Sequence, residues 1–109
     1  MKNELLLSLW IELKQLIEPL CEGLPIITDE PGDWRVETTT GRPFLTLRIQ
    51  KSHVGLYLLA MYYHQHILPK SIDAYLFGKS TFRFHSFNDL PLEGIQEIVE
   101  SARSLIGSY

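Results

Sequence analysis

The sequence has a single cysteine, Cys21, and it lacks the short motifs that mark catalysis or tight metal binding. A lone cysteine cannot form an intramolecular disulfide, which favours a reducing compartment. The chain carries no glycine-rich phosphate loop, no nucleophile elbow and no cysteine or histidine pair at the spacing of a zinc site. Because no nucleophile stands beside a base, we predict no catalytic residues and a protein that is not an enzyme.

The sequence also lacks a long apolar run and a basic excess. Its longest apolar run, Val54 to Tyr63, is about half of the ~20 residues that a membrane-spanning helix needs. Glu4, Glu12 and Lys14 interrupt the leucine-rich start, which is therefore not typical of a signal peptide. Ten basic and thirteen acidic side chains give a formal charge of −3, whereas nucleic-acid binders usually show a basic excess. These absences predict a cytoplasmic protein with no membrane span and no nucleic-acid partner.

What the sequence does contain is typical of one globular domain over residues 1–109. Its apolar fraction of 45% and charged fraction of 21% are ordinary values for a folded domain. Residues 3 to 20 carry apolar side chains at three- and four-residue spacings, which predicts a helix with one wide apolar face. A similar pattern predicts a closing helix that starts near Asn88 to Pro91 and runs to about Ile106.

Between these helices, alternating apolar and polar residues predict strands. A two-residue loop at Gly41-Arg42 would place Val36 opposite Leu47 and Trp34 opposite Ile49. The other segments are assigned as follows: a turn-rich connector over 28–33, one strand over 54–63, a short helix over 69–77 and a last strand over 81–86. This order predicts an α+β fold, a two-layer α/β sandwich with both terminal helices on one face of an antiparallel sheet of four to five strands.

The face of the sheet turned away from the helices is predicted to be unusually apolar and aromatic, with arginines beside the apolar side chains. If the last strand joins the same sheet, it adds a further arginine and a histidine to this face. The predicted ligand or interface residues are Arg35, Phe44, Arg48, Tyr57, Leu59, Met61, Arg83 and His85.

Three explanations of such a face stay open at this point. Loops or the short helix cover it, or it forms a homodimer interface, since aromatic residues, Met and Arg are enriched there. Alternatively, it forms a pocket in which the arginines hold a small anionic ligand. Each explanation predicts a binding or accessory domain rather than an enzyme.

Two further groups of residues are weighed as metal ligands. His64 and His66 would face the same way on a strand and so could chelate a metal, although solvated polar surface is the more frequent role of such a pair. His53 and His85 are isolated in sequence, so any joint role depends on the fold. The acidic side of the first helix offers oxygen ligands for weak cation binding through Glu4, Glu12, Glu18 and Glu22.

Two motifs in order resemble a known family. His53-Val54-Gly55-Leu56-Tyr57 follows Lys51-Ser52, and Gly78-Lys79-Ser80-Thr81-Phe82-Arg83-Phe84 precedes a closing helix that contains Glu100-Ser101-Ala102-Arg103. Over roughly residues 30 to 106 the chain is similar to the YdhG-like domain-of-unknown-function family, small bacterial proteins whose fold resembles frataxin.

The resemblance implies a frataxin-like α/β sandwich formed by a single YdhG-like domain. Some relatives are regarded as iron chaperones that bind iron weakly through acidic residues of the first helix and first strand. The matching positions here are Glu4, Glu12, Glu18 and Glu22, extended by Asp29 and Asp33. Iron is therefore the one cofactor that the resemblance suggests, and an iron-binding chaperone is the alternative to a ligand-binding or dimerising domain.

Overall fold

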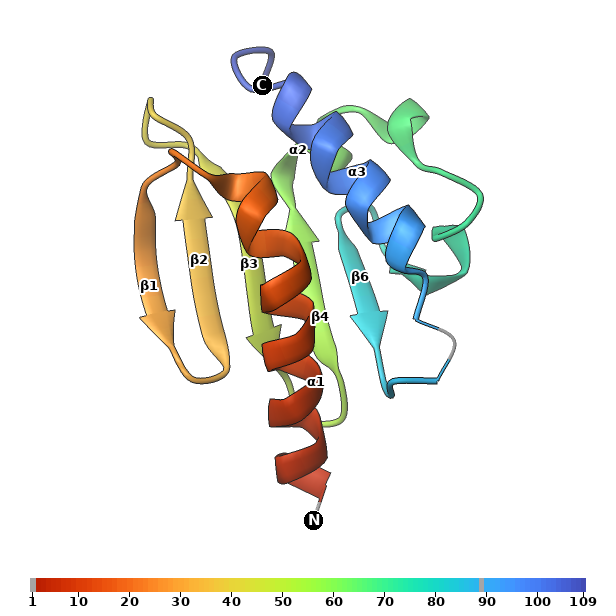
Figure 1. Cartoon of the computed structure of the whole chain (residues 1–109). Helices are drawn as coiled ribbons and strands as arrows, with labels where there is room; N and C mark the ends of the chain where they lie inside the picture. The colour runs from red at the N-terminus through yellow and green to blue at the C-terminus, as the bar shows by residue number, and fades with distance from the viewer. Residues whose placement is uncertain (1, 89) are drawn as a thin grey trace.

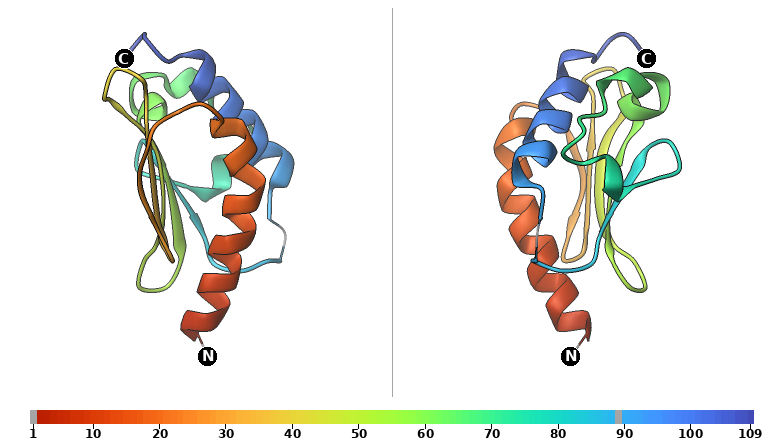
Figure 2. Two further views of the ribbon diagram at one scale, coloured as in Figure 1. Left: turned by 60° about the vertical axis from the view of Figure 1, so that its left-hand side comes forward. Right: turned by 90° about the vertical axis from the view of Figure 1, so that its right-hand side faces the viewer.

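Helices α1 and α3 lie together on one face of an antiparallel sheet in the computed structural model of the chain (Figures 1 and 2). The structure describes residues 2–88 and 90–109, which contain six strands in the order β1-β2-β3-β4-β6-β5. The α+β prediction is confirmed, and the prediction of four to five strands is wrong. The elements are α1 (Lys2–Ile17), η1 (Glu18–Cys21), β1 (Ile26–Glu30), β2 (Asp33–Glu37), β3 (Pro43–Ile49), β4 (Val54–Leu58), α2 (Leu59–Tyr63), η2 (Gln65–Ile67), η3 (Asp73–Tyr75), β5 (Leu76–Phe77), β6 (Thr81–Phe84) and α3 (Leu92–Ser104).

The two long helices match their predicted positions with shorter ends. The first helix becomes a 3-10 turn at Glu18 because Pro19 follows and cannot donate a backbone hydrogen bond. The closing helix begins at Leu92, and Asp89, within its predicted start, lies outside the described residues. Trp10 fixes α1 on the sheet, since its indole Nε1 donates a buried 2.8 Å hydrogen bond to the carbonyl of Leu47. No helix in the described part of the chain is long and apolar enough to cross a membrane.

The two extra strands lie at the edges of the sheet, in segments predicted as a connector and a short helix. Strand β1 spans Ile26–Glu30 and pairs with β2, with a register irregularity between Ile26 and Thr28. Strand β5 is only Leu76–Phe77 and pairs with β6. Both were missed for the same reason: an edge strand pairs on one side and needs little apolar alternation, so its periodicity signal is weak.

The central hairpin confirms the predicted face but not the predicted register. Trp34 lies opposite Leu47 and Val36 opposite Leu45, two residues from the predicted pairing. The loop is longer than the predicted Gly41-Arg42 turn, because the backbone of Thr38 bonds the carbonyl of Arg42 and an irregularity follows Val36. A shift of two residues returns each side chain to the same face, which is why the apolar set still points to the core.

The predicted strand over 54–63 is wrong in its second half. Strand β4 ends at Leu58, and Leu59–Tyr63 form the short helix α2 at the end of the sheet. Leu58 is the last residue of β4 paired with β3, and further pairing would meet Pro43, which has no N–H. A continuous apolar run fits a buried strand or a buried helix equally, so periodicity alone could not separate the two halves.

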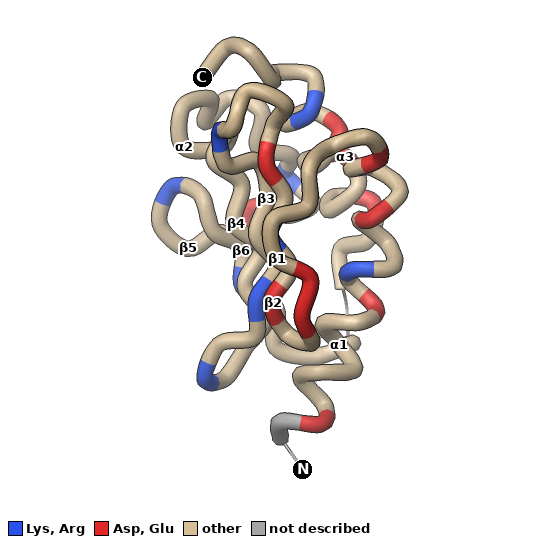
Figure 3. The backbone as a smooth tube through the Cα atoms, turned by 90° about the vertical axis from the view of Figure 1, so that its left-hand side faces the viewer, with Lys and Arg blue, Asp and Glu red and all other residues tan. Residues whose placement is uncertain are grey.

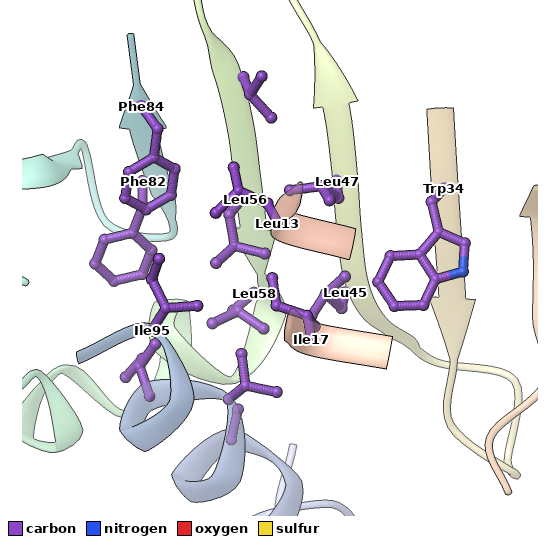
Figure 4. Close-up of a cluster of buried hydrophobic side chains, with 14 of the residues drawn as sticks. Leu13, Ile17, Trp34, Leu45, Leu47, Leu56, Leu58, Phe82, Phe84 and Ile95 are labelled. Atoms are coloured by element: carbon purple, nitrogen blue, oxygen red, sulfur yellow. The ribbon is translucent and has the colours of Figure 1, made fainter. Parts of the chain in front are cut away.

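The core fills the space between the helices and the near face of the sheet (Figure 4). Alternate residues of the four central strands point into it, and Ile17 and Ile95 meet them from the two helices. Phe82 and Phe84 of β6 are fully buried in this core. The residues between these core positions therefore point to the opposite face of the sheet.

Candidate functional site

A pocket of about 330 Å³ opens on the face of the sheet that the long helices do not cover. It spans the three strands β3, β4 and β6, and β5 borders it. Its lining mixes cationic, hydroxyl and aromatic side chains around one glycine: Thr46, Arg48, Gln50, His53, Gly55, Tyr57, Phe77, Thr81 and Arg83. No carboxylate is present among these described residues. We call this pocket the sheet groove.

Two arginines and a glycine form the central row of the sheet groove. Gly55 lies opposite Arg48 of β3 on one side and opposite Arg83 of β6 on the other. The Cα atoms of the arginines are therefore about 9.6 Å apart, twice the spacing of neighbouring strands. Gly55 adds no side chain between the two arginines, and all three residues line the same groove.

The β5–β6 turn holds one of these arginines in place. Gly78 adopts a φ of 72°, a left-handed conformation that other residues rarely take, and this turn pairs Phe77 with Thr81. The guanidinium carbon of Arg83 lies 3.5 Å from the centroid of the Phe77 ring. This cation–π contact restricts the long side chain while leaving its N–H donors unoccupied by the ring.

The arginines of this face differ in whether their charge is already neutralised. Arg35 forms two hydrogen bonds with the carboxylate of Asp33, Nε to Oδ1 at 2.9 Å and the second nitrogen to Oδ2 at 3.0 Å. Among the described residues, no ion pair joins a carboxylate to Arg48 or to Arg83. Asp33 also lies directly opposite Arg48, but both of its carboxylate oxygens accept from Arg35. Among the described residues, the guanidinium donors of Arg48 and Arg83 are therefore left for an external anion, whereas two donors of Arg35 are already used.

Two histidines that are far apart in sequence meet beside Arg83. The rings of His53 and His85 have centroids 5.6 Å apart. Burial lowers the pKa of His53 below its ordinary value of 6.5, and the positive charges of Arg83 and His85 lower it further. The fold thus places the two histidines side by side. Because its pKa is lowered, the neutral form of His53 is favoured.

The other end of the sheet groove supplies neutral donors. Tyr57 lies in one row with Thr46 and Thr81, directly opposite both. Burial, with a smaller contribution from Tyr63, raises the pKa of Tyr57, so its phenol keeps its proton at neutral pH. Three hydroxyl groups therefore face the same opening as the arginines, and each can donate to an oxyanion.

Positive and negative residues are unevenly distributed between the sheet and the helices. Lysines and arginines are most frequent on the strands and the loops that join them, with Lys14 on α1 and Arg103 on α3, while acidic residues recur along α1, α3, β1 and β2 (Figure 3). The formal net charge of −3 hides this distribution. A locally positive field raises the concentration of anions at the sheet groove even though the whole protein is acidic.

The predicted ligand or interface residues divide into two groups. Arg48, Tyr57 and Arg83 line the sheet groove, and His85 joins them through His53. Arg35 faces a neighbouring pocket that shares Tyr57 and Thr46. The apolar members lie elsewhere than predicted: Phe44 and Met61 are fully buried and Leu59 is half-buried. Leu59 and Met61 lie in α2 because the strand ends at Leu58. The predicted apolar patch is therefore absent from this face in the described part of the chain.

The glutamates predicted as metal ligands do not converge. Glu4, Glu12 and Glu18 are exposed and spread along about 21 Å of helix at 1.5 Å per residue. Glu18 lies 3.8 Å from the ammonium group of Lys14. In the part of the chain that the structure describes, no group of three or more His, Cys, Asp or Glu side chains is arranged to hold a metal ion.

The other residues that the sequence suggested for metal binding or catalysis lie outside the sheet groove. His64 and His66 lie around the 3-10 turn η2 rather than on a strand, with ring centroids 5.7 Å apart. His64 Nε2 is 3.2 Å from the hydroxyl of Ser108. Cys21 is buried, and burial raises the pKa of its thiol to about 12. A protonated, buried thiol is a poor nucleophile.

Sequence reasoning missed several lining residues of the sheet groove. Phe77 was assigned to a helix, and His53 had no partner until β4 and β6 paired. Gly55 carried the one usable signal, because an isolated glycine inside an apolar strand often marks a place where something approaches the backbone.

Comparisons of the chain with protein-family models, curated proteins and solved structures found no match. The resemblance to the YdhG-like family and to the frataxin fold therefore stays a prediction from the sequence.

Proposed function

We propose that this chain is a non-enzymatic binding domain that holds a small anionic ligand in the sheet groove. The observation that carries this proposal is the central row, in which Arg48 and Arg83 flank Gly55. Neither arginine has a carboxylate partner among the described residues. Charge-assisted hydrogen bonds from guanidinium to an oxyanion are about twice as strong as neutral ones, so two such groups give a site for an anion.

The neutral side chains of the sheet groove support the same ligand class. Thr46, Tyr57 and Thr81 add hydroxyl donors, and no carboxylate is found among the described residues that line the groove. A ligand with negative charge gains from both features, whereas a cation would meet two unneutralised arginines.

Self-association through this face is the weaker use of it. The prediction of a homodimer rested on aromatic, methionine and arginine side chains at this face, and of these Phe44 and Met61 are buried inside the chain. Two copies meeting through the sheet groove would bring like charges together, which costs several kcal/mol at an interface. Iron carriage by the acidic face of α1 stays a proposal from the resemblance alone, since no described metal cluster supports it.

The proposal is tested by titrating the protein with sulfate and phosphate, using isothermal calorimetry and amide chemical shifts at low ionic strength. We expect the largest shifts at Gly55 and its neighbours in β3 and β6. Arg48→Gln and Arg83→Gln should each weaken binding by about tenfold or more, the effect of losing one strong charged contact.

The matched control is the double variant Asp33→Asn with Arg35→Gln, because it removes this ion pair as a unit and leaves no free carboxylate opposite Arg48. Its affinity for the anions should equal that of the unaltered protein. An equal loss of anion affinity in all three variants would show that the loss is not specific to the arginines of the sheet groove. The absence of any binding to the unaltered protein would refute the proposal.

A further inference from the structure

We infer that the sheet groove selects a phosphorylated small molecule, a doubly charged phosphate monoester, over a monocarboxylate, and that His53, which lines the groove beside His85, takes up a proton when it binds. This inference rests on the proposed function and specifies its ligand. It depends on three features of the groove: the number of cationic groups, the free space beside them and the histidine pair.

The cationic groups exceed what one negative charge requires. Arg48 and Arg83 carry fixed charge on opposite sides of Gly55. A carboxylate has two oxygens in one plane and satisfies one guanidinium in the two-pronged geometry. A phosphate monoester carries up to two charges and three free oxygens in a tetrahedral arrangement. It can accept from both arginines and still present an oxygen to a hydroxyl or imidazole.

The volume of the sheet groove is larger than that of an inorganic phosphate ion. Its 330 Å³ corresponds to roughly eleven water molecules at about 30 Å³ each. An inorganic phosphate, with five heavy atoms, fills less than half of this volume. The remainder borders Tyr57 and Phe77, and Phe77 leaves 58% of its surface exposed. These aromatic walls suit an organic group attached to the phosphate.

The histidine pair links binding to protons. The charged and titratable groups that face His53 are Arg48 from β3, Tyr57 from β4, and Arg83 with His85 from β6 and the residue after it. Burial, followed by the positive charges of Arg83 and His85, lowers the pKa of His53 and so favours its neutral form. A dianion between the arginines reverses the sign of that local field and favours the imidazolium. Because protons are then taken up on binding, affinity rises as the pH falls.

The ligand class is tested with phenyl phosphate and benzoate, which share a ring and differ in the anionic group. At pH 8 phenyl phosphate is doubly charged and benzoate singly charged. We expect phenyl phosphate to bind about tenfold more tightly or better, and more tightly than inorganic phosphate. Equal affinities for phenyl phosphate and benzoate would overturn the ligand class while leaving anion binding in place. No binding of phenyl phosphate, benzoate or inorganic anions would refute the proposed function as well.

The proton uptake is tested with sulfate, whose charge does not change between pH 5.5 and 8.5, about the range in which histidine titrates. We expect the affinity for sulfate to increase toward pH 5.5, by roughly tenfold if the pKa of one histidine rises by one unit on binding. The double variant His53→Gln with His85→Gln should bind sulfate with a flat pH profile. His66→Gln removes a histidine outside the groove and should leave the profile unchanged. A profile that is flat in the unaltered protein, or that survives the double substitution, would overturn the role of the histidine pair.

Discussion

The two faces of the central strands are built from alternate residues of the same segments and have opposite properties. In β6, Phe82 and Phe84 are fully buried in the core, while Arg83 between them faces the sheet groove. In β4, Leu56 and Leu58 are fully buried, while Gly55 and Tyr57 lie on the groove side. One backbone thus carries a stabilising surface and a binding surface that are separable by substitution.

The comparison teaches that a residue's neighbours in sequence say little about its role in a sheet. The core face gains stability from apolar burial, about 25 cal/mol per Å² of surface removed from water. The groove face contains unneutralised arginines and a glycine, which contribute little to the free energy of folding. Substitutions one residue apart should therefore affect different properties.

The largest expected effect is the loss of stability caused by emptying the core face. Phe82→Ala should lower the free energy of unfolding by about 3–5 kcal/mol, the usual cost of removing a buried phenyl ring. Urea titration followed by circular dichroism measures this change. The adjacent Arg83→Gln should change the free energy of unfolding by no more than about 0.5 kcal/mol. Similar losses for both variants would contradict the division of the strand into two roles.

The next effect is an alkaline loss of stability caused by Cys21. Burial raises the pKa of this thiol from 9.0 to about 12 in the folded protein, so the unfolded chain releases the proton first. The free energy of unfolding should therefore fall above pH 9, by about 1.4 kcal/mol per pH unit, and level off near pH 12. Cys21→Ala, compared with the unaltered protein by urea titration at pH 8 and pH 10, should show a shallower fall. Parallel curves would show that Cys21 does not contribute.

A smaller and opposite effect on stability is expected at Gly55. A Cβ at this position would meet its nearest atoms at 3.8 Å, an ordinary contact distance. Gly55→Val should thus keep the fold and raise the free energy of unfolding by up to about 1 kcal/mol, since valine favours strands. The same side chain would fill the space between Arg48 and Arg83 and abolish sulfate binding in calorimetry. Retained sulfate affinity in the folded variant would place the anion elsewhere.

The smallest effect is expected at Arg35. Its guanidinium is exposed and bonded to Asp33 within the same strand, and exposed ion pairs contribute little. Asp33→Asn with Arg35→Gln, which removes the pair without freeing a carboxylate opposite Arg48, should leave both the urea midpoint and the affinity for sulfate unchanged. A clear loss of sulfate affinity would mean that Arg35 acts with Arg48 and Arg83 and that the anion site extends across β2.

The sequence predicted the fold class, the helical layer and the inward set of the central strands. Trp34, Val36, Leu45 and Leu47 repeat every second residue, which assigns them to one face whatever the register. It failed where that periodicity is weak or ambiguous. The run after Leu58 is largely apolar and was predicted as strand. That prediction assigned Leu59 and Met61 to the wrong face of the sheet. The candidate site was predicted in part, because Arg48, Tyr57 and Arg83 follow from alternation once β6 joins the sheet.

The sequence by itself determined which residues alternate, which helices are amphipathic and that no local catalytic motif is present, because these properties depend on neighbours along the chain. The tertiary structure alone decided that Arg48, Gly55 and Arg83 share one row. It also decided that His53 meets His85 and that Asp33 neutralises Arg35 rather than Arg48. Those relations depend on strand order and register, which bring together residues separated by up to 35 positions. No local pattern in the chain encodes that distance.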